Sequence, residues 1–411
     1  MVPFSAFSSR TSRTSRHSKQ VVGVALSGAV LCAPLAFASS AQADSDSSTA
    51  STRSGGPTVL GLYGAQDPVY NAAFRQGFAI LGLKSAKAGI NSDALTWLTK
   101  QQCSNGSWSA YRSDLSVPCA PPNPDTYSGS DSNSTSMGAA AFAVAGKTKK
   151  MNRAISWLRA RQNSDGGWAY YSAPGATSDA NSTGLVVLAL AAAGKDPSKV
   201  RRKGGKSAAQ YLRSVQKRCS ASADVRGGLR FQKVPPPDVN NLASAQVSLG
   251  LLPLVKGTGK RATVTGSAPK IRKGSPILDC TTSTGSRGDV PSALLTTSTR
   301  GALLGYLSKT INANAGSIPS AYGSGPDVGS TANAVTALAA AGYGRSAVNA
   351  GLRTLKQNSG TYLVSPSQAG PNAADPGALA YYILAAQAAG KNPRNFGGIN
   401  LVSTLKSTMQ R

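Results

Sequence analysis

The stretch AISWLRARQNSDGGW at residues 154–168 decides the fold class, because the chain repeats it. A close copy, ALTWLTKQQCSNGSW, stands sixty residues earlier at 94–108. In both, two tryptophans lie eleven residues apart, with a glutamine and a Gly-containing turn between them. Weaker copies follow at 211–229, 306–318 and 352–362. Each copy predicts an amphipathic helix that ends in a glycine turn, after which an aromatic or aliphatic side chain returns to the core.

A second kind of segment alternates with these copies and consists of an Asp followed by small and apolar residues. Three such segments begin DSNST (131–135), DANST (179–183) and DVGST (327–331), and looser ones begin at Asp67, Asp238 and Asp375. Helices that are apolar on nearly every side must be buried, whereas amphipathic helices can cover them. With a last amphipathic helix at 400–409, six helices of each kind predict an all-α fold. The expected architecture is an (α/α)6 toroid of six inner and six outer helices, with few or no strands.

The spacing of these Asp residues reveals one insertion. Asp238 and Asp327 are 89 residues apart, whereas the other neighbours in the series are 48 to 64 residues apart. The excess falls at 256–291, a stretch rich in Lys, Gly, Ser and Thr, which we expect to be a basic insertion loop tethered by Cys280. The toroid domain is therefore expected to span residues 60–411.

The N-terminal region has the pattern of a cleaved secretion signal. Residues 1–20 contain four basic residues and no acid, residues 21–38 are almost wholly apolar, and the sequence AQA at 41–43 has the form of a cleavage site. We expect a signal peptide at 1–43, a disordered Ser/Thr/Gly leader at 44–59, and a secreted or cell-wall-associated protein. An uncleaved membrane anchor is the alternative, which Pro34 and the cleavage pattern disfavour.

The composition limits the possible chemistry. All 16 acidic residues are Asp, no Glu is present, and the single His is His17, inside the predicted signal. Without the four basic residues of that signal, the remaining 40 basic and 16 acidic residues give a formal net charge of +24. Such an excess attracts polyanions such as wall polymers, anionic lipid headgroups or nucleic acid, and we take it as affinity for anionic cell-wall polymers. No aromatic-basic recognition module is evident, so we expect no specific nucleic acid partner.

Four cysteines remain after the predicted signal, an even number that in a secreted chain predicts disulfides. Proximity favours a Cys103–Cys119 pair, which leaves Cys219 with Cys280. A zinc site is the rival interpretation, but the chain lacks the CxxC spacing and the His that such a site needs. We therefore expect no metal.

Together, the Trp repeats and the Asp-led helices resemble the prenyltransferase and squalene-oxidase repeat proteins over roughly residues 60–410. The resemblance implies an α/α toroid, a fold that hosts terpene cyclases, protein prenyltransferases, complement thioester domains and cobalamin carriers. The cyclases use a DxDD motif, but the only DxD here is at 44–46, in the leader. The prenyltransferases bind zinc partly through His, and thioester domains need a Cys-Gly-Glu-Gln sequence. The chain expected after cleavage has neither His nor Glu.

The remaining branch is similar in style to the toroid domain of intrinsic-factor and transcobalamin-type cobalamin carriers, which are secreted, non-catalytic and disulfide-bearing. Their inner helices also begin with Asp followed by Ser or Thr. This resemblance implies no required cofactor, but a possible corrinoid ligand. Such carriers add a β-rich domain that closes over the ligand, and nothing after Lys391 could supply one. A separate lid protein or a membrane uptake system is therefore the expected partner.

An Asp at a helix start usually caps the helix, and this is the simplest interpretation of each Asp taken alone. The functional interpretation rests on repetition, because six inner helices that start at one end would bring short polar side chains together around a ligand. Tyrosines in the preceding loops could stack on a flat ligand. The candidate ligand-binding residues are Asp131, Asn133, Thr135, Asp179, Asn181, Thr183, Asp238, Asn241, Asp327, Thr331, Asp375, Tyr127, Tyr171 and Tyr322.

Three hypotheses follow. The first is a secreted, non-catalytic toroid that captures a corrinoid or another amide-rich small molecule for uptake. The second is a scaffold that binds anionic cell-wall polymers through basic faces at 195–218 and 256–273. The third is an enzyme that acts on a glycan or an isoprenoid through Asp and Tyr, with no catalytic residue assigned.

Overall fold

The computed structural model describes residues 59–65, 72–234, 238–252, 254–257, 262–280, 294–321, 323–364 and 373–411. Contacts divide the chain into residues 1–38 and 39–411, and all described residues belong to the second unit. The predicted signal peptide, nearly all of the leader, and Asp67 lie outside the described residues.

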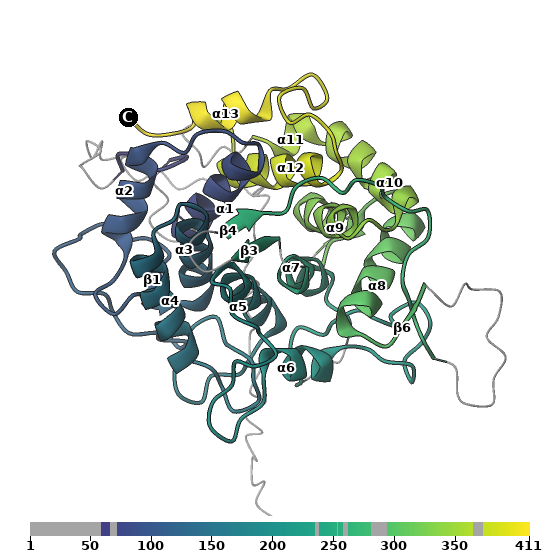
Figure 1. The fold of residues 1–411 in the computed structure, drawn as a ribbon, viewed down its shortest axis with the longest axis horizontal. Helices are drawn as coiled ribbons and strands as arrows, with labels where there is room; N and C mark the ends of the chain where they lie inside the picture. Colours follow the sequence, from purple (N-terminus) through teal and green to yellow (C-terminus); the bar gives the residue numbers. More distant parts are fainter. Residues whose placement is uncertain are drawn as a thin grey trace, which may run out of the picture. The chain divides into compact units, whose positions relative to one another are not determined.

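Six buried helices of the described chain pack side by side in a closed order. Each contacts the next one along the chain, and the last contacts the first. Figure 1 shows them around a common centre. Their mean composition is apolar and their buried residues cover every side, as the alternation in the sequence predicts. They are α1 (Ala72–Ser85), α3 (Ser132–Val144), α5 (Ala180–Ala192), α7 (Asn241–Leu251), α9 (Val328–Ala341) and α12 (Pro376–Ala388).

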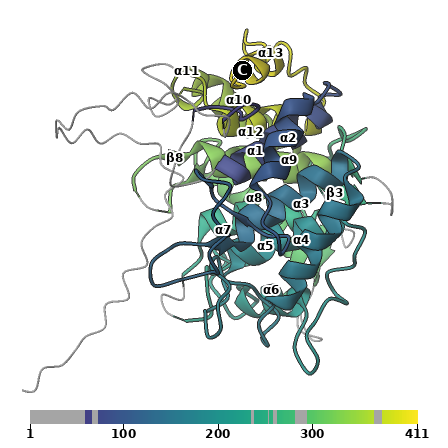
Figure 2. The same cartoon turned by 90° about the vertical axis from the view of Figure 1, so that its left-hand side faces the viewer.

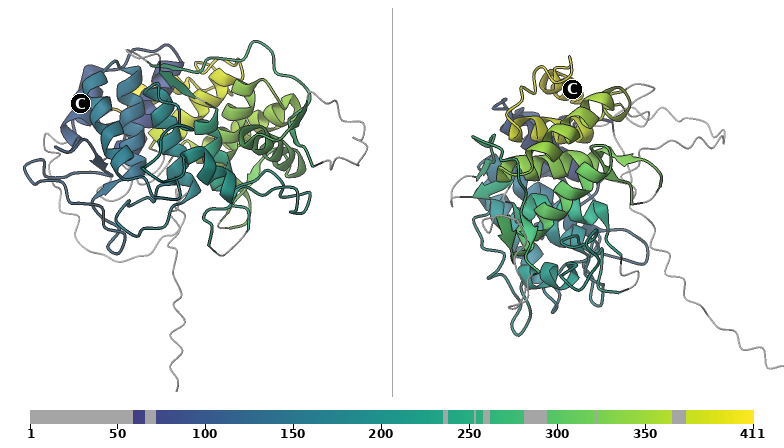
Figure 3. Two further views of the ribbon diagram at one scale, coloured as in Figure 1. Left: turned by 60° about the horizontal axis from the view of Figure 1, so that its bottom comes forward. Right: turned by 90° about the vertical axis from the view of Figure 1, so that its right-hand side faces the viewer.

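Amphipathic helices pack on the outside of these inner helices. α4, for example, buries Ile155, Trp157 and Leu158 and exposes Arg159. Figure 2 shows the side that carries α2 and α4, and the right panel of Figure 3 shows the side of α8 and α10. The structure is therefore a helix-rich α/α fold. The outer helices are α2 (Ser92–Gln101), α4 (Thr148–Ala160), α6 (Ala208–Val215), α8 (Thr299–Ala313), α10 (Arg345–Gln357) and α13 (Leu401–Ser407), with a single turn, α11 (Ser359–Tyr362), after α10.

Short extended segments connect each outer helix to the next inner helix. β1 (Trp108–Ser109) pairs with β2 (Ser130–Asp131), and β7 (Ile318–Pro319) pairs with β8 (Pro326–Asp327), both antiparallel. A single antiparallel bridge between Trp168 and Asp179 takes the same place in the second Trp repeat. The residue that returns to the core is thus held beside the residue that starts the next inner helix. β5 (Ile277–Leu278) and β6 (Leu295–Thr296) form a parallel pair before α8.

Hydrogen bonds hold the turn of the Trp repeat to the helix before it and to the next segment of the chain. The indole N–H of Trp168 donates to the carbonyl of Leu158 at 2.7 Å, and the ring is fully buried. The side-chain amide of Gln162 donates to the carbonyls of Gly166 and Val200 at 3.0 and 3.2 Å, which links the turn to the segment before α6. Gly166 has φ +93°, and a Cβ there would lie 2.3 Å from the Ser207 carbonyl, so only glycine fits.

Part of the predicted insertion lies within the described residues. β3 (Val255–Gly257) and β4 (Ala262–Val264) form an antiparallel hairpin, and the chain continues across the C-terminal ends of inner helices. A Cβ on Gly257 would lie 2.1 Å from the Ala192 carbonyl at the end of α5. Further along, Ala268 N donates to Ala388 O and Arg272 N donates to Gly342 O, at the ends of α12 and α9. We call residues 255–257 and 262–273 the strap; in the view of Figure 1 its two strands are drawn over the centre of the ring, and Figure 2 shows β3 at one end of the helices.

Candidate functional site

Four of the predicted Asp caps are confirmed. Asp131, Asp179, Asp327 and Asp375 each accept the backbone N–H of the residue three positions later, at 2.6 to 2.9 Å. The prediction is wrong for Asp238, which is exposed, because α7 begins later and Asn240 caps it by accepting the Ala243 N–H at 2.8 Å. Asn and Asp are equally good caps, so Asn240 supplies the same side-chain acceptor to the helix start without a negative charge.

The starts of the inner helices lie at the same end of the ring. Ser132 N donates to Tyr170 O, and Ala180 N donates to Phe231 O, so the start of each helix contacts the segment that leads to the next one. Ala73 N donates to Ala110 O in the same way. On the other side, a Cβ added to Gly329 in the first turn of α9 would lie 2.5 Å from the Tyr362 hydroxyl, and one added to Gly377 at the start of α12 would lie 3.7 Å from Arg75 Cγ of α1. The predicted convergence of the helix starts therefore has a structural basis in these neighbouring contacts.

The three candidate threonines are buried and already bonded inside the protein. Thr183 Oγ1 donates to the Asp179 carbonyl at 2.7 Å and accepts the Trp168 N–H at 3.0 Å. Thr135 and Thr331 make the equivalent pairs, with Trp108 and Ile318 as the donors. These hydroxyls hold the returning turn against the inner helix. Asn241 is similarly engaged, because its amide donates to Pro319 O while it accepts the Tyr306 hydroxyl.

Three candidate side chains at the starts of α3 and α5 have buried oxygen atoms without a hydrogen-bond partner among the described residues. They are Asp131 Oδ2, Asn133 Oδ1 and Asn181 Oδ1. Their side chains are 0%, 5% and 7% exposed. Asn133 and Asn181 occupy the same position of the DxNST sequence, and the amide of Asn181 donates to Gln246 Oε1 on α7 at 2.8 Å. We call Asp131, Asn133 and Asn181 the acceptor cluster.

Burial raises the pKa of two of the capping residues, Asp131 and Asp179. Desolvation raises the pKa of Asp131 to about 7, although the N–H groups of Ser134 and Asn133 partly oppose it. Desolvation also raises the pKa of Asp179 to about 7, opposed by the N–H groups of Ser182 and Tyr170. Near neutral pH both carboxyl groups are therefore divided between a form that only accepts hydrogen bonds and a form that also donates one.

Three tyrosines lie together beside the acceptor cluster. The rings of Tyr170 and Tyr171 pack edge to face at 4.6 Å, and the Tyr171 hydroxyl donates to the Tyr127 carbonyl at 2.6 Å. Burial and then the nearby Asp131 carboxylate raise the pKa of Tyr170 well above its usual value. Tyr127 is 58% exposed, so its ring is accessible to a ligand. Tyr322, the fourth tyrosine of interest, lies outside the described residues.

The starts of α9 and α12, at the same end of the ring, carry different residues from the starts of α3 and α5. Where α3 and α5 have Asn, α9 and α12 have Gly329 and Gly377. A Cβ on Gly329 would lie 2.5 Å from the Tyr362 hydroxyl, so glycine admits this tyrosine against the helix start. Burial, then Tyr381 and Asp327, raise the pKa of Tyr362. Our sequence reasoning missed Tyr362, Tyr381 and Gln246, although a Gln within an otherwise apolar helix was a signal for the last.

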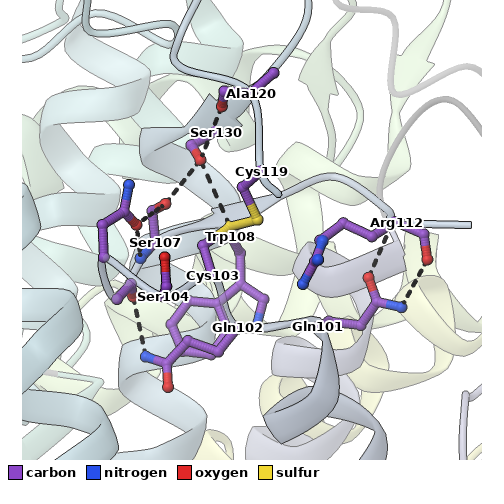
Figure 4. Close-up of a disulfide and its surroundings, with 12 residues drawn as sticks. Gln101, Gln102, Cys103, Ser104, Ser107, Trp108, Arg112, Cys119, Ala120 and Ser130 are labelled. Atoms are coloured by element: carbon purple, nitrogen blue, oxygen red, sulfur yellow. Dashed lines mark hydrogen bonds between the residues drawn. A yellow bond between two sulfur atoms is a disulfide. The ribbon is translucent and has the colours of Figure 1, made fainter. Parts of the chain in front are cut away.

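A disulfide supports the segment that leads to Asp131. Cys103 is bonded to Cys119, and Cys219 to Cys280, as predicted. Beside the first bond, Ser107 Oγ donates to Ser130 Oγ at 2.7 Å, and Cys103 Sγ lies 3.7 Å from the same oxygen. Figure 4 shows Ser130 between the disulfide and the loop at Ala120. Because Ser130 directly precedes Asp131, this bond restrains the position of the acceptor cluster.

Neither a metal site nor a membrane helix is found in the part of the chain that the structure describes. No three His, Cys, Asp or Glu side chains gather there as metal ligands would. None of the helices described there combines the length and the apolar character that crossing a membrane requires.

Comparison with known proteins supports the resemblance derived from the repeats. Residues 130–226 match the family model described as squalene-hopene cyclase C-terminal domain, which confirms the resemblance to the squalene-oxidase repeat proteins over that region. A solved structure described as a protein from Actinoplanes is similar with a TM-score of 0.47 and 16% identity, covering 80% of this chain and 93% of that one. No curated protein matches the chain.

Proposed function

We propose that this protein is an extracellular, non-catalytic binding protein with an (α/α)6 toroid, which captures a small molecule at the N-terminal end of α3 and α5. The observation that carries the proposal is the acceptor cluster, in which three buried oxygen atoms have no partner among the described residues. A buried polar atom without a hydrogen bond costs about 1–3 kcal/mol. A ligand that donates to these atoms recovers this free energy, and the burial of the atoms is then explained.

The chemistry of the cluster favours a ligand with several amides. Oxygen atoms of Asn133 and Asn181 need donors, while Asp131 can accept or donate because its pKa is about 7. Primary amides carry both N–H and C=O groups and suit such a mixed set. A corrinoid of the cobalamin type is a flat molecule with many amides, and the rings of Tyr127, Tyr170 and Tyr171 lie where one could stack. A membrane uptake system or a lid protein would complete the binding.

Extracellular location is supported by two features. The first is the signal-like segment before Asp44, and the second is the pair of disulfides. Disulfides persist in oxidising compartments, so the two disulfide bonds are compatible with an extracellular location.

A titration tests the proposal. Cobinamide and cobalamin, added separately to the protein expressed as residues 44–411, should bind with Kd in the micromolar range or tighter. Asn133→Leu should weaken binding at least tenfold without lowering thermal stability, because it removes an amide whose buried oxygen has no described partner. Asn395→Leu, an exposed Asn far along the chain, is the matched control and should bind as the wild type does. Binding no tighter than about 1 mM for both ligands would remove the corrinoid version.

The second candidate function is an enzyme in which Asp131 and Asp179 act as acid and base on a glycan or an isoprenoid. The raised pKa values of both groups favour it, since a general acid works best when its pKa lies near the operating pH. Turnover of a glycan or isoprenoid panel that Asp179→Asn abolishes is the result this candidate requires. Asn keeps the helix cap, so loss of turnover would report on the charge alone.

A further inference from the structure

The end of the molecule opposite the acceptor cluster is strongly basic because of how the inner helices end. α3, α5 and α12 all finish with Ala-Gly-Lys, at 145–147, 193–195 and 389–391. In each, the glycine has φ near +70° and the lysine N–H bonds back to the carbonyl five residues earlier at 2.8 Å. This is the usual glycine-terminated helix end, and it places a lysine just beyond the C-terminus, where the helix dipole favours a cation.

Further basic residues join these lysines. Lys87 lies two residues beyond the end of α1 and has φ +52°. The Arg394 guanidinium donates to the carbonyl of Ala86, the residue before Lys87. The strap crosses the ends of α5, α9 and α12 and carries four more. Contacts of Gly257, Ala268 and Arg272 with those ends place the strap on the same face. We call the resulting set the basic face, and all its members are exposed: Lys87, Lys147, Lys195, Lys256, Lys270, Arg272, Lys273, Lys391 and Arg394.

Acidic residues are nearly missing from this face in the described chain. The four capping Asp residues lie at the opposite end, as helix capping requires. Asp196 beside Lys195 and Asp93 in the first turn of α2 are acids on adjoining segments, and the Asp196 carboxylate accepts from Ser198. No member of the basic face forms an ion pair with a described carboxylate; the pair that the described residues do form joins Lys233 and Asp165. The positive charge is therefore not compensated locally.

We propose that the basic face docks the protein on a flexible polymer of phosphodiesters in the cell envelope, with the acceptor cluster facing away from it. Seven of the nine cations are lysines, whose mobile ammonium groups suit a phosphate chain without fixed geometry. The exposed large apolar residues are Leu60, Val117, Tyr127, Val234 and Ile277, and none belongs to the face. The ring recorded beside the face is that of half-buried Tyr343, and the Arg272 guanidinium lies over it at 5.4 Å. The face thus offers no fully exposed ring for stacking on bases and no exposed large apolar side chain for entering a bilayer.

The test compares two variants with equal charge loss. One replaces Lys87, Lys147, Lys195 and Lys391 by Gln; the other replaces Lys100, Arg159, Arg353 and Lys406, all exposed on outer helices, by Gln. The probe is fluorescently labelled poly(glycerol phosphate), titrated at several salt concentrations. The wild type should bind less tightly as salt rises. The first variant should bind at least tenfold more weakly, with a salt dependence shallower by about one for each lost phosphate contact. The second variant should stay within about threefold of the wild type.

Three outcomes would overturn the proposal. They are equal losses in both variants, binding that does not weaken with salt, and tighter binding to duplex DNA or anionic vesicles than to the polymer through the same lysines. Thermal unfolding and the corrinoid titration should be the same in all three proteins. The docking proposal and the ligand proposal can therefore fail separately.

Discussion

Two features of Asp131 have opposite effects on the charge of its carboxyl group. As a cap it accepts the Ser134 N–H at a helix start, which favours the charged form. As a fully buried side chain it favours the neutral form, and burial prevails, raising its pKa to about 7. The carboxyl group therefore changes charge close to neutral pH.

The raised pKa of Asp131 makes the free energy of unfolding decrease as pH rises. An unfolded Asp titrates near 3.8, so between that value and about 7 the folded chain holds a proton on Asp131 that the unfolded chain has lost. The contribution is complete at acid pH and is lost as pH rises through 7. We predict that Asp131→Asn reduces the fall in the free energy of unfolding between about pH 5 and pH 8, by up to a few kcal/mol.

Urea unfolding of both proteins at the two pH values, with the disulfides intact, measures this effect. Asp179 titrates in the same sense as Asp131, because burial raises its pKa to about 7. Asp165 titrates in the opposite sense: burial raises its pKa, but hydrogen bonds from Gly167, Ser178 and Lys233 together outweigh it and lower the pKa. The comparison with the variant cancels their contribution. Identical pH dependence in the two proteins would show that Asp131 is charged in the fold throughout this range.

Residue-level roles were only partly predictable. The DxNST pattern identified the caps Asp131 and Asp179, because capping is a local rule. It did not distinguish Thr183 from Asn181 two residues earlier, although one hydroxyl is bonded to Trp168 and one amide oxygen has no described partner. That difference depends on the turn that packs against the helix, fifteen residues away.

At the scale of the elements, several helix ends need a residue with a left-handed backbone conformation, which glycine adopts without strain. Gly390 ends α12 with φ +69°, and the nearest atom to a Cβ there would be Ser267 Cβ at 3.8 Å, an ordinary contact. A substitution therefore adds backbone strain without a clash. We predict that Gly390→Ala lowers the free energy of unfolding by about 1–2 kcal/mol.

Gly360 offers the matched control for this substitution. It lies in α11 with no atom within 4 Å of a Cβ and no positive φ. Gly360→Ala should be neutral or stabilise the protein by up to about 1 kcal/mol. Chemical denaturation of both variants measures the difference. Equal effects would mean that the end of α12 does not need its left-handed glycine.

Most helices were predictable because their periodicity and their caps are local features. The start of α7 was not, because Asp238 has the same character as the true caps and lies only two residues before Asn240. The strap was expected as a loop. Its strands pack against α1, α3 and α5, and the residues after them bond to the ends of α12 and α9. No pattern within 256–291 records these contacts.

At the scale of the whole molecule, the two ends of the described chain hold the ring closed. Gly61 N donates to Gln410 O and Gln410 N donates to Leu62 O, while the Gln387 amide donates to Ser85 O between α12 and α1. Each inner helix therefore has two inner neighbours. An open helical repeat would leave its terminal helices with only one.

We predict that a chain ending at 375 loses cooperative unfolding, because the deletion exposes apolar surface on both α1 and α9. A circular permutant that joins 411 to 59 by a short Gly linker and begins at Gly175, which has no close neighbours, should keep its transition. Differential scanning calorimetry compares both with residues 59–411. A cooperative transition near the original Tm in the truncated chain would contradict the closed ring.

The sequence alone indicated the alternation of buried and amphipathic helices and four of the Asp caps, because periodicity and capping are local properties. It favoured the Cys103–Cys119 pair by proximity and reached Cys219–Cys280 only by elimination. Only the tertiary structure decided which polar atoms stay without partners and how charge is distributed. Asn133 and Asn181 stand out because neighbouring turns satisfy the threonines but not these amides. Lysines distant in the chain share one face because parallel inner helices all end there, and such a grouping depends on packing between segments far apart in sequence.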